Sequence, residues 1–385
     1  MRAFLADADW APRSGGLLSA DEGARKRAYN GSQAWKNPRL AVADVPVPAA
    51  GRDDLLIKVS HCGICGSDTH TYETDTEGYI IFSGLAQLPC ILGHEFTGEV
   101  VEVGSGVRGF AKGDIVTSES VMWCGTCVPC RTGMPNQCEH VELMGLSAPG
   151  AFAEYTAVNA KYCWKLNSLE ERYAREDVLK VGTLVEPIGC AYNGLFISAG
   201  GYLPGAHAVV YGAGPIGLGA VMLLKNSGAA SITAVDIVGQ RLDIARKLGA
   251  DFVLDGRDMG AVEARIMEIT GGWGADMQVE AAGARSTMRT IQKLAAKRGK
   301  IVYLGRAEAS AAMELNGMVS GAIDMVGSRG HSGYGIFPNI IKLLQHGRLA
   351  GALDIVTSVF PFAEIAQAFA ASSKRQDGKI LIQIG

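Results

Sequence analysis

The sequence has no excess of basic residues: 36 lysines and arginines stand against 39 aspartates and glutamates, a formal net charge of −3. Proteins that bind a phosphate backbone or an anionic membrane surface present a positive field. The sequence also lacks the apolar segment of a signal peptide, because Arg2, Asp7 and Asp9 interrupt its first residues. We therefore expect a cytoplasmic protein with neither nucleic acid nor a membrane as a partner.

One stretch lacks charge altogether. Residues 187–224 contain no Asp, Glu, Lys or Arg, and this length would suffice to cross a bilayer. Glycines and prolines break the stretch, and in lipid they would leave backbone groups without hydrogen-bond partners. They are Gly200, Gly201, Pro204, Gly205, Gly212, Gly214 and Pro215. The stretch is therefore predicted to form a buried strand, a tight turn and a helix.

The nine cysteines are an odd number without a secretory signal, which favours metal binding or catalysis over a disulfide framework. Cys124, Cys127, Cys130 and Cys138 follow a C-x2-C-x2-C-x7-C spacing. Four thiolates at such short gaps can converge on one tetrahedral zinc, and this closed shell leaves no position for a substrate. The spacing predicts a structural zinc site, although iron–sulfur clusters use similar gaps.

The chain changes in pattern along its length, and its 385 residues favour two domains. Short alternating apolar segments up to about residue 150 are typical of β-strands: 55–59, 98–103, 114–117 and 152–157. From about residue 208, strands alternate with helices, which predicts a parallel, doubly wound sheet of the α/β class. An amphipathic helix near 340–344 and a strand, KILIQIG, follow, and we expect this strand to return to the first domain.

A dinucleotide-binding motif lies where a strand meets a helix. Residues 209–217 read VVYGAGPIG, with Gly212, Gly214 and Gly217 in G-x-G-x-x-G order and Pro215 and Ile216 between the last two. The glycines permit a tight turn, close approach of the pyrophosphate and close helix packing.

A carboxylate follows 19 residues after the last glycine of this motif. This residue, Asp236, is placed to accept bonds from the adenosine ribose, which favours NAD over NADP. Arg241 complicates the choice, because a guanidinium can accept a 2′-phosphate; alternatively, it lies over the adenine or in solvent.

Three further segments read HCGICGSDTH (61–70), LGHEFTGEV (92–100) and LVEPIG (184–189). Together with the cysteine motif and the glycine motif, in this order, they resemble the zinc-containing medium-chain dehydrogenases, over essentially the whole chain. The resemblance implies a GroES-like β-rich catalytic domain, residues 1–187 and 331–385, and a doubly wound Rossmann domain that binds NAD, residues 188–330. It also implies an enzyme with one catalytic and one structural zinc per subunit, working as a homo-oligomer.

The resemblance assigns the catalytic zinc to Cys65 and His94, with Glu95 and Glu186 completing or exchanging within the shell. A glutamate at position 186, where liver-type alcohol dehydrogenases carry a cysteine, argues for the branch of sorbitol and threonine dehydrogenases. The zinc lowers the proton affinity of the substrate oxygen. Ser67 is placed to take the hydroxyl proton and His70 to pass it outward, although His70 can equally be a surface polar residue.

The substrate implied is a secondary alcohol of a small polyol, sugar alcohol or cyclitol, because the chain resembles scyllo-inosose and tetritol dehydrogenases. The acidic loop YETDTEGYI (72–80) can accept bonds from several hydroxyls, or it can simply be solvated. A threonine-type amino alcohol and a non-catalytic NAD(P)-binding relative are the alternatives. Residues 13–36 look like an insertion, and the pattern assigns them no role.

Overall fold

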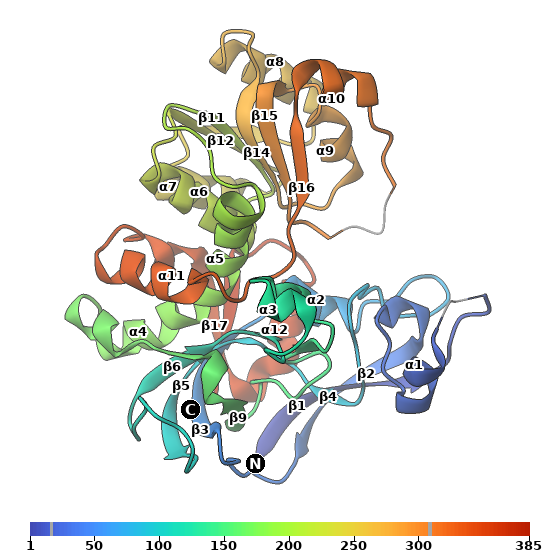
Figure 1. Ribbon diagram of the computed structural model, residues 1–385, viewed down its shortest axis with the longest axis vertical. Helices are drawn as coiled ribbons and strands as arrows, with labels where there is room; N and C mark the ends of the chain where they lie inside the picture. Colours follow the sequence, from blue (N-terminus) through green and yellow to red (C-terminus); the bar gives the residue numbers. More distant parts are fainter. Residues whose placement is uncertain (16–17, 307–309) are drawn as a thin grey trace. The chain divides into compact units, whose positions relative to one another are not determined.

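The computed structural model of the chain describes residues 1–15, 18–306 and 310–385. These residues form two compact units, which are described separately (Figure 1). Unit 1 contains Met1–Glu186, Ser358–Arg375 and Ile380–Gly385, and unit 2 contains Pro187–Thr357 and Gln376–Lys379. The domain boundaries drawn from the sequence stay a prediction. By contacts, residues 331–357 fall in unit 2.

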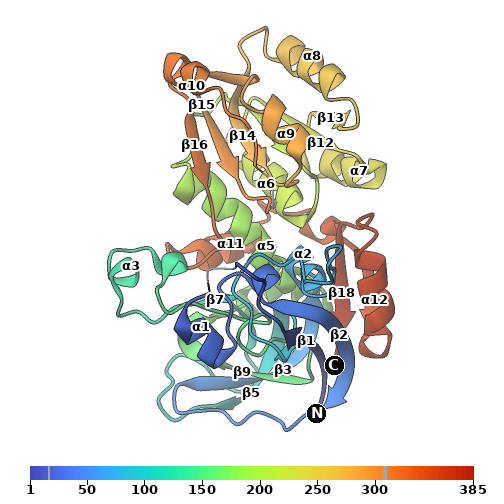
Figure 2. The same ribbon diagram turned by 90° about the vertical axis from the view of Figure 1, so that its right-hand side faces the viewer.

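Unit 1 is built on a seven-stranded sheet in the order β10-β6-β5-β3-β18-β17, with β9 also paired to β3. Its strands are β3 (Asp54–Gly63), β5 (Glu95–Val103), β6 (Ile115–Ser118), β9 (Tyr155–Asn159), β10 (Cys163–Lys165), β17 (Val356–Pro361) and β18 (Lys379–Gln383). The C-terminal strand β18 lies antiparallel to β3, with Leu381 opposite Gly63. The predicted return of this strand to the first domain is therefore confirmed, and both termini lie in unit 1 (Figure 2).

Smaller elements complete unit 1. A three-stranded sheet in the order β2-β1-β4 contains β1 (Arg2–Trp10), β2 (Trp35–Asp44) and β4 (Cys90–Ile91), and β7 (Val121–Met122) pairs with β8 (Glu142–Leu143). The helices are α1 (Ala20–Arg25), α2 (Gly66–His70), α3 (Val128–Arg131), α4 (Arg175–Val181) and α12 (Ile365–Ser372). Helix α5 (Val185–Tyr192) contains the boundary between the two units.

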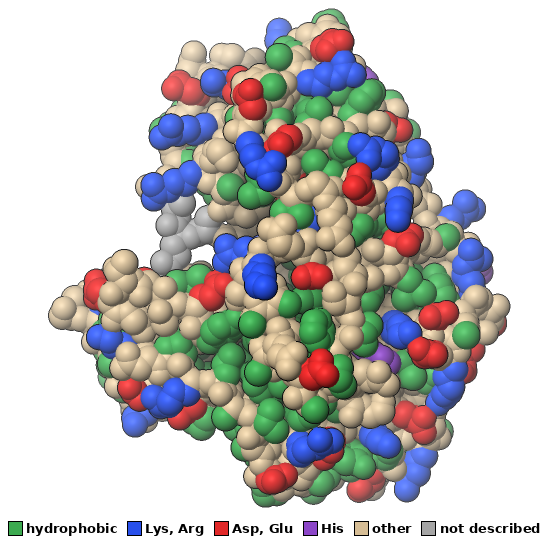
Figure 3. All heavy atoms as spheres, turned by 180° about the vertical axis from the view of Figure 1, so that it is seen from behind, with side chains coloured by type: hydrophobic (Ala, Val, Ile, Leu, Met, Phe, Trp, Pro, Cys, Tyr) green, Lys and Arg blue, Asp and Glu red, His purple; other side chains and the backbone are tan. Residues whose placement is uncertain are grey.

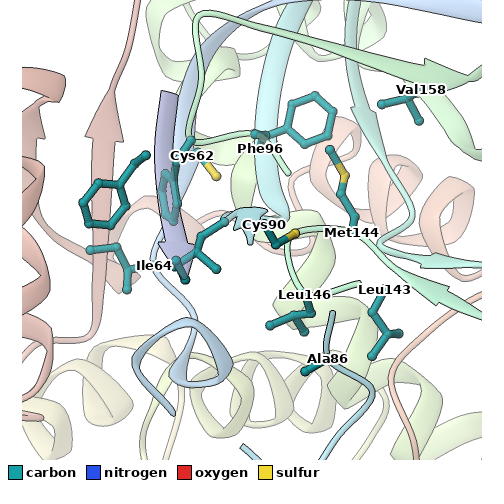
Figure 4. Close-up of a cluster of buried hydrophobic side chains, with 14 of the residues drawn as sticks. Cys62, Ile64, Ala86, Cys90, Phe96, Leu143, Met144, Leu146 and Val158 are labelled. Atoms are coloured by element: carbon teal, nitrogen blue, oxygen red, sulfur yellow. The ribbon is translucent and has the colours of Figure 1, made fainter. Parts of the chain in front are cut away.

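The core of unit 1 contains several of the remaining cysteines. Cys62 and Cys90 lie among apolar side chains such as Phe96 and Met144 (Figure 4). Burial raises the pKa of Cys90 to about 12 and that of Cys163 to about 12 as well. Because the thiolate is the reactive form, thiols held protonated in this way are inert packing groups.

Unit 2 is a six-stranded parallel sheet in the order β13-β12-β11-β14-β15-β16. Its strands are β11 (His207–Tyr211), β12 (Ser231–Asp236), β13 (Phe252–Asp255), β14 (Ala275–Glu280), β15 (Ala295–Tyr303) and β16 (Asp324–Gly327). Its helices are α6 (Pro215–Asn226), α7 (Gly239–Leu248), α8 (Met259–Ile269), α9 (Arg285–Thr290), α10 (Leu315–Gly321) and α11 (Ile336–Gln345). Figure 1 shows α6 and α7 on one side of the sheet and α9 and α10 on the other. This is the predicted doubly wound arrangement.

The uncharged stretch 187–224 folds as its glycines and prolines predicted. It contains most of α5, a π-helical turn (Asn193–Ser198), strand β11 and most of α6. In the part of the chain that the structure describes, no helix combines the length and the apolar character that crossing a membrane requires. The backbone groups of this stretch are satisfied by strand pairing and helix bonds instead.

Charges of both signs are interspersed on the face of the molecule drawn in Figure 3. Many of them pair locally, as Arg175 does with Glu99 and Glu170 at 2.7 and 3.0 Å. Exposed pairs of this kind contribute about 1 kcal/mol or less to the free energy of unfolding. They keep the surface mixed in charge without determining the fold.

Candidate zinc and dinucleotide sites

The first candidate site begins where strand β3 ends and helix α2 starts. Cys65 caps the N-terminus of α2, and its backbone N–H donates to the carboxylate of Asp68 at 2.9 Å. The other oxygen of Asp68 accepts a bond from the N–H of Gly93 at 3.3 Å. Asp68 therefore joins the Cys65 turn to the segment that precedes His94, and it is fully buried.

Three of the predicted ligands come together here. Their candidate ligand atoms, the Cys65 sulfur, a ring nitrogen of His94 and a carboxylate oxygen of Glu95, lie within 4.8 Å of one another. His94 and Glu95 are buried, and Cys65 is half-buried. Sulfur, imidazole and carboxylate donors are the set that zinc accepts, and three protein ligands leave a position open for a substrate. The residues present therefore fit a catalytic zinc.

The electrostatics of His94 are set by its acidic surroundings. Burial by itself lowers the pKa of the ring, but the carboxylate of Asp68, the Cys65 side chain and Glu186 outweigh it and raise the pKa well above its usual range. The Asp68 oxygen lies 3.6 Å from His94 Nδ1. A cluster of negative groups around an imidazole is an environment that attracts a cation.

Glu186 and His70 are less closely associated with this group. Glu186 lies in the first turn of α5, is buried, and accepts a bond from the Ser120 hydroxyl at 2.9 Å. It influences the pKa of His94 without belonging to the group of three. Ser67 Oγ lies 3.4 Å from His94 Nε2, whereas His70 ends α2 and is half-buried. The relay from Ser67 to His70 stays a prediction.

The four cysteines of the second candidate metal site also converge. The sulfur atoms of Cys124, Cys127, Cys130 and Cys138 lie within 4.8 Å of one another. The Cys124 sulfur accepts bonds from Thr126, which lower its pKa to about 5, whereas burial raises the pKa of Cys130 to about 12. Backbone N–H groups aimed at sulfur, as that of His140 is at Cys138 at 3.3 Å, stabilise thiolates. The group fits a closed structural zinc.

The carboxylates of the acidic loop after α2 are paired with arginines. Asp75 and Glu77 both pair with Arg13, whose guanidinium also stacks over the Tyr79 ring at 3.8 Å. Glu73 pairs with Arg375 at 2.9 Å. All three carboxylates are therefore paired with arginines of unit 1, although the Glu77 side chain remains 67% exposed.

A neighbouring residue of the loop, Tyr72, is also engaged within unit 1. Its hydroxyl bonds to the carbonyl of Phe369 at 3.1 Å and to the Ser373 hydroxyl. The expectation that this loop recognises a polyol stays a prediction.

The insertion at residues 13–36, two of which lie outside the described residues, contacts the acidic loop through Arg13 and has bonds of its own. Ser19 and Glu22 form a capping box that starts α1, and the Glu22 carboxylate also accepts from the N–H of Tyr29 at 2.8 Å. Ser32 N–H donates to the carbonyl of Phe82 at 2.9 Å.

A second contact reaches the end of the cysteine motif, where the Arg27 guanidinium bonds to the Val141 carbonyl at 2.7 Å. Sequence reasoning missed the roles of Arg13 and Arg27, because the carboxylates and carbonyls they bind are distant along the chain.

The dinucleotide motif follows β11 in unit 2, and a Cβ would meet different surroundings at each of its three glycines. Gly212 has φ +90°, and a Cβ there would lie 2.7 Å from the backbone nitrogen of Ala282. A Cβ at Gly217 would lie 1.8 Å from the carbonyl oxygen of Gly212. At Gly214 the space is open, since the nearest atom is an Arg241 guanidinium nitrogen at 3.9 Å. Of the three glycines, only Gly214 has no close neighbour in the protein that would exclude a Cβ.

Pro215 and Ile216 are the first residues of α6, and both are half-buried. Proline is favourable in the first helical turn, because an N–H there has no acceptor within the helix. The carboxylate of Asp236, at the end of β12, accepts from the N–H of Ala213 at 2.6 Å and from that of Val238 at 2.8 Å. Arg241 donates through Nε to the carbonyl of Asp377 at 2.7 Å. The predicted cofactor residues thus surround one turn.

One buried acid in unit 2 was missed from the sequence. Glu280 ends β14 and accepts bonds from the Thr287 hydroxyl and two backbone N–H groups. Its only sequence signal is a charged residue at the end of an apolar strand, in VEAAG.

Comparisons with known proteins agree with this arrangement. Residues 51–168 match the family model of the alcohol dehydrogenase GroES-like domain, and residues 215–346 match that of the zinc-binding dehydrogenases. The scyllo-inosose 3-dehydrogenase of Thermotoga maritima is 38% identical over 90% of this chain and 91% of its own length. The L-threonine 3-dehydrogenase of Bacillus velezensis is 33% identical over 88% of this chain and 94% of its own.

A solved structure from Thermotoga maritima, assigned to the alcohol dehydrogenases, superposes with a TM-score of 0.94 at 36% identity and covers all of both chains. The predicted fold class, a GroES-like β-rich domain plus a doubly wound domain, is confirmed by these matches. The zinc predicted for the cysteine motif is likewise favoured over an iron–sulfur cluster.

Proposed function

The chain belongs to the zinc-binding, medium-chain alcohol dehydrogenases, and from this premise we propose that it oxidises a secondary alcohol of a small polyol or cyclitol to the ketone with NAD, reversibly. The observation that carries the proposal is the gathering of Cys65, His94 and Glu95 in one buried group. Three protein ligands of mixed type are the set of a catalytic metal, whereas four thiolates are that of a structural one.

In this proposal Cys65, His94 and Glu95 hold the catalytic zinc, and Glu186 completes the shell or exchanges with Glu95. When bound, zinc acts as a Lewis acid that lowers the pKa of the substrate hydroxyl. Asp68 keeps the Cys65 turn and the His94 segment in register through its bonds to Cys65 and Gly93. Residues that orient metal ligands in this way adjust the affinity of the site for the metal and the geometry of its ligands.

The proton of the substrate hydroxyl leaves through Ser67. Its Oγ lies 3.4 Å from His94 Nε2, which places the hydroxyl at the rim of the ligand group. His70, at the end of the same helix and partly exposed, passes the proton to solvent. The two side chains lie three residues apart on α2, a spacing that places side chains on one face of a helix.

The four cysteines of the cysteine motif hold a second, structural zinc. Two sites of different openness predict different lability, because a closed thiolate shell releases its metal more slowly than an open mixed one. Elemental analysis of the purified enzyme should find two zincs per chain, and mild chelation should remove one together with activity. A single zinc in freshly purified active enzyme contradicts this assignment.

Asp236 makes NAD the preferred cofactor. Backbone N–H groups hold both of its oxygens at the glycine turn, and each oxygen keeps a lone pair for a ribose hydroxyl. A phosphate on that ribose meets a fixed negative charge. A guanidinium nitrogen of Arg241 lies 3.9 Å from where a Cβ of Gly214 would stand, so Arg241 stays a candidate to accept a 2′-phosphate or to lie over the adenine.

A polyol or cyclitol is proposed as the substrate because of the similarity to the scyllo-inosose 3-dehydrogenase. The experiment is a panel followed by NADH absorbance: inositol-derived ketoses with NADH, and erythritol, threitol, sorbitol, L-threonine, ethanol and butanol with NAD. We expect cyclitols or tetritols to give the highest kcat/KM. Simple primary alcohols as the best substrates would contradict the substrate class.

An amino alcohol of the threonine type is the second candidate, favoured by the 33% identity to an L-threonine 3-dehydrogenase. The same panel separates the two. A threonine kcat/KM above that of every polyol, by more than about tenfold, would favour this candidate.

A homo-oligomer in the cytoplasm completes the proposal. Helix α10, which precedes β16, the last strand in its sheet, exposes Leu315 and Val319, and exposed apolar side chains favour association. Light scattering should give a dimer or tetramer, and Val319→Lys should reduce the mass. The proposed location in the cytoplasm is supported by the nine cysteines, which form no disulfide within the described residues. Cell fractionation is the test of this location.

A further inference from the structure

Glu280 occupies the point in unit 2 where the strand order reverses. From β11 the chain builds β12 and β13 on one side of the sheet and then β14, β15 and β16 on the other (Figure 2). Dinucleotides bind at such a switch point, beyond the carboxyl ends of the strands. Glu280 is the last residue of β14, and it lies opposite Tyr211, the last residue of β11.

The carboxylate of Glu280 is fully buried, with 0% of the residue exposed. Oε1 accepts from the hydroxyl of Thr287 at 2.8 Å and from the N–H of Ala282 at 3.2 Å, and both oxygens lie 3.0 Å from the N–H of Gly283. Burial raises the pKa of this carboxyl, and these bonds oppose the shift. Burying a carboxylate costs free energy, and the hydrogen bonds to its oxygens offset that cost here.

The backbone of the same residue holds a second turn. The carbonyl of Glu280 accepts from the N–H of Leu304 at 2.8 Å and from that of Gly305 at 2.9 Å, directly after β15. A Cβ at Gly305 would lie 2.4 Å from Gly283 N and 2.6 Å from Oε2 of Glu280. The turns after β14 and β15 are therefore packed against each other around Glu280 without room for a methyl group.

The first of these turns also touches the dinucleotide motif. A Cβ at Gly212 would lie 2.7 Å from the nitrogen of Ala282, and the N–H of Ala281 donates to the carbonyl of Tyr211 at 2.8 Å. Asp236, the residue proposed to bind the adenosine ribose, is the last residue of β12. This strand pairs with β11 on the side opposite β14. Because a dinucleotide spans the switch point, its nicotinamide half lies over the β14 and β15 side.

We infer that Glu280 is a positioning residue for the nicotinamide half of the cofactor: it fixes the turns 281–283 and 304–306 as one wall of that half of the site. Its carboxylate and carbonyl together hold five backbone or hydroxyl donors, and both turns follow strands on the nicotinamide side. The inference rests on the dinucleotide of the proposed function but not on its polyol substrate.

The test compares two ligands that differ only by the nicotinamide ring. NADH and ADP-ribose are titrated into the purified, zinc-loaded full chain by calorimetry. In Glu280→Gln an amide nitrogen replaces one acceptor oxygen and faces N–H donors, so the turns lose their anchor. We expect the Kd of NADH to rise about tenfold, and that of ADP-ribose to change by less than about twofold.

Asp276→Asn is the matched control. It makes the same chemical change at the opposite end of β14, where the carboxylate accepts from the N–H of His207 at 2.8 Å. It should leave the ratio of the two Kd values unchanged, even if it lowers the melting temperature. Equal weakening of both ligands in Glu280→Gln, no weakening of NADH, or the same selective loss in Asp276→Asn overturns the inference.

A second variant keeps the inference testable if Glu280→Gln does not fold. Thr287→Val removes only the hydroxyl donor, and the selective loss of NADH affinity should recur at about threefold. An unchanged ratio in a folded Thr287→Val variant would then overturn the inference. If the wild-type protein binds ADP-ribose and NADH well but turns over no polyol, the proposed substrate fails while Glu280 remains assigned.

Discussion

The two candidate sites of this protein are built in opposite ways. In unit 1 the ligand group works through side chains that are brought together: Cys65 from the start of α2, and His94 and Glu95 from the start of β5. In unit 2 the proposed site at the turn around Gly214 depends on the absence of a side chain, which leaves open space there. A site of the first kind is lost when a donor atom is removed, and a site of the second kind when an atom is added.

The largest expected effect comes from removing a donor. Cys65→Ala should reduce turnover below detection, because the zinc loses one of three close ligands. NADH should bind with a Kd within about twofold of the wild type, since the glycine turn lies in the other unit. Cys62→Ala, a buried thiol three residues earlier, is the control and should keep zinc and activity. Full turnover by the Cys65→Ala variant would contradict the assignment of Cys65 as a zinc ligand.

Removing the proposed proton acceptor should have the next largest effect. Ser67→Ala should lower kcat by about two to four orders of magnitude with little change in zinc content, the range for a positioned proton acceptor. Ser67→Thr, which keeps the hydroxyl, should retain most of the activity. If alanine and threonine at this position behave alike, the proton leaves by another route.

Adding one carbon atom tests the other kind of site. Gly214→Ala should raise the Kd of NADH about a hundredfold by blocking the pyrophosphate, while stability is unchanged because the nearest atom to the new Cβ is 3.9 Å away. Gly217→Ala should instead lower stability by about 1–3 kcal/mol, because its Cβ would lie 1.8 Å from a carbonyl oxygen. Equal melting temperatures for the two variants would contradict this division of roles.

What could be predicted from the sequence follows the same division. The glycine motif and the cysteine motif are local patterns, and each residue in them is fixed by neighbours a few positions away. Several strands of the seven-stranded sheet, the alternation of strands and helices in unit 2, and the return of β18 to unit 1 could likewise be read from the apolar pattern, whereas β1, β2, β10 and β17 were not predicted. The place of residues 331–357 in unit 2 rests on long-range contacts, which apolar periodicity does not report.

The acidic loop and Glu280 show why the remainder was missed. Asp75 and Glu77 look like isolated acidic side chains until Arg13, more than sixty residues earlier, is placed beside them. Glu280 looks like a strand end until the turns after two strands close around it. In both cases the function of a carboxylate depends on partners that are distant along the chain, and composition does not encode that pairing.

The smallest expected effect concerns the choice between two cofactors. Asp236→Ala removes the ribose acceptor and the repulsion of a 2′-phosphate, so the ratio of kcat/KM for NAD to that for NADP should fall about tenfold, or about 1.4 kcal/mol. Asp255→Ala is the matched control. Asp255 lies opposite Asp236 on β13, but its carboxylate pairs with Arg257 at 2.7 Å. It should leave the ratio unchanged. If both variants change the ratio equally, the effect is one of general charge, and Asp236 has no specific contact with the ribose.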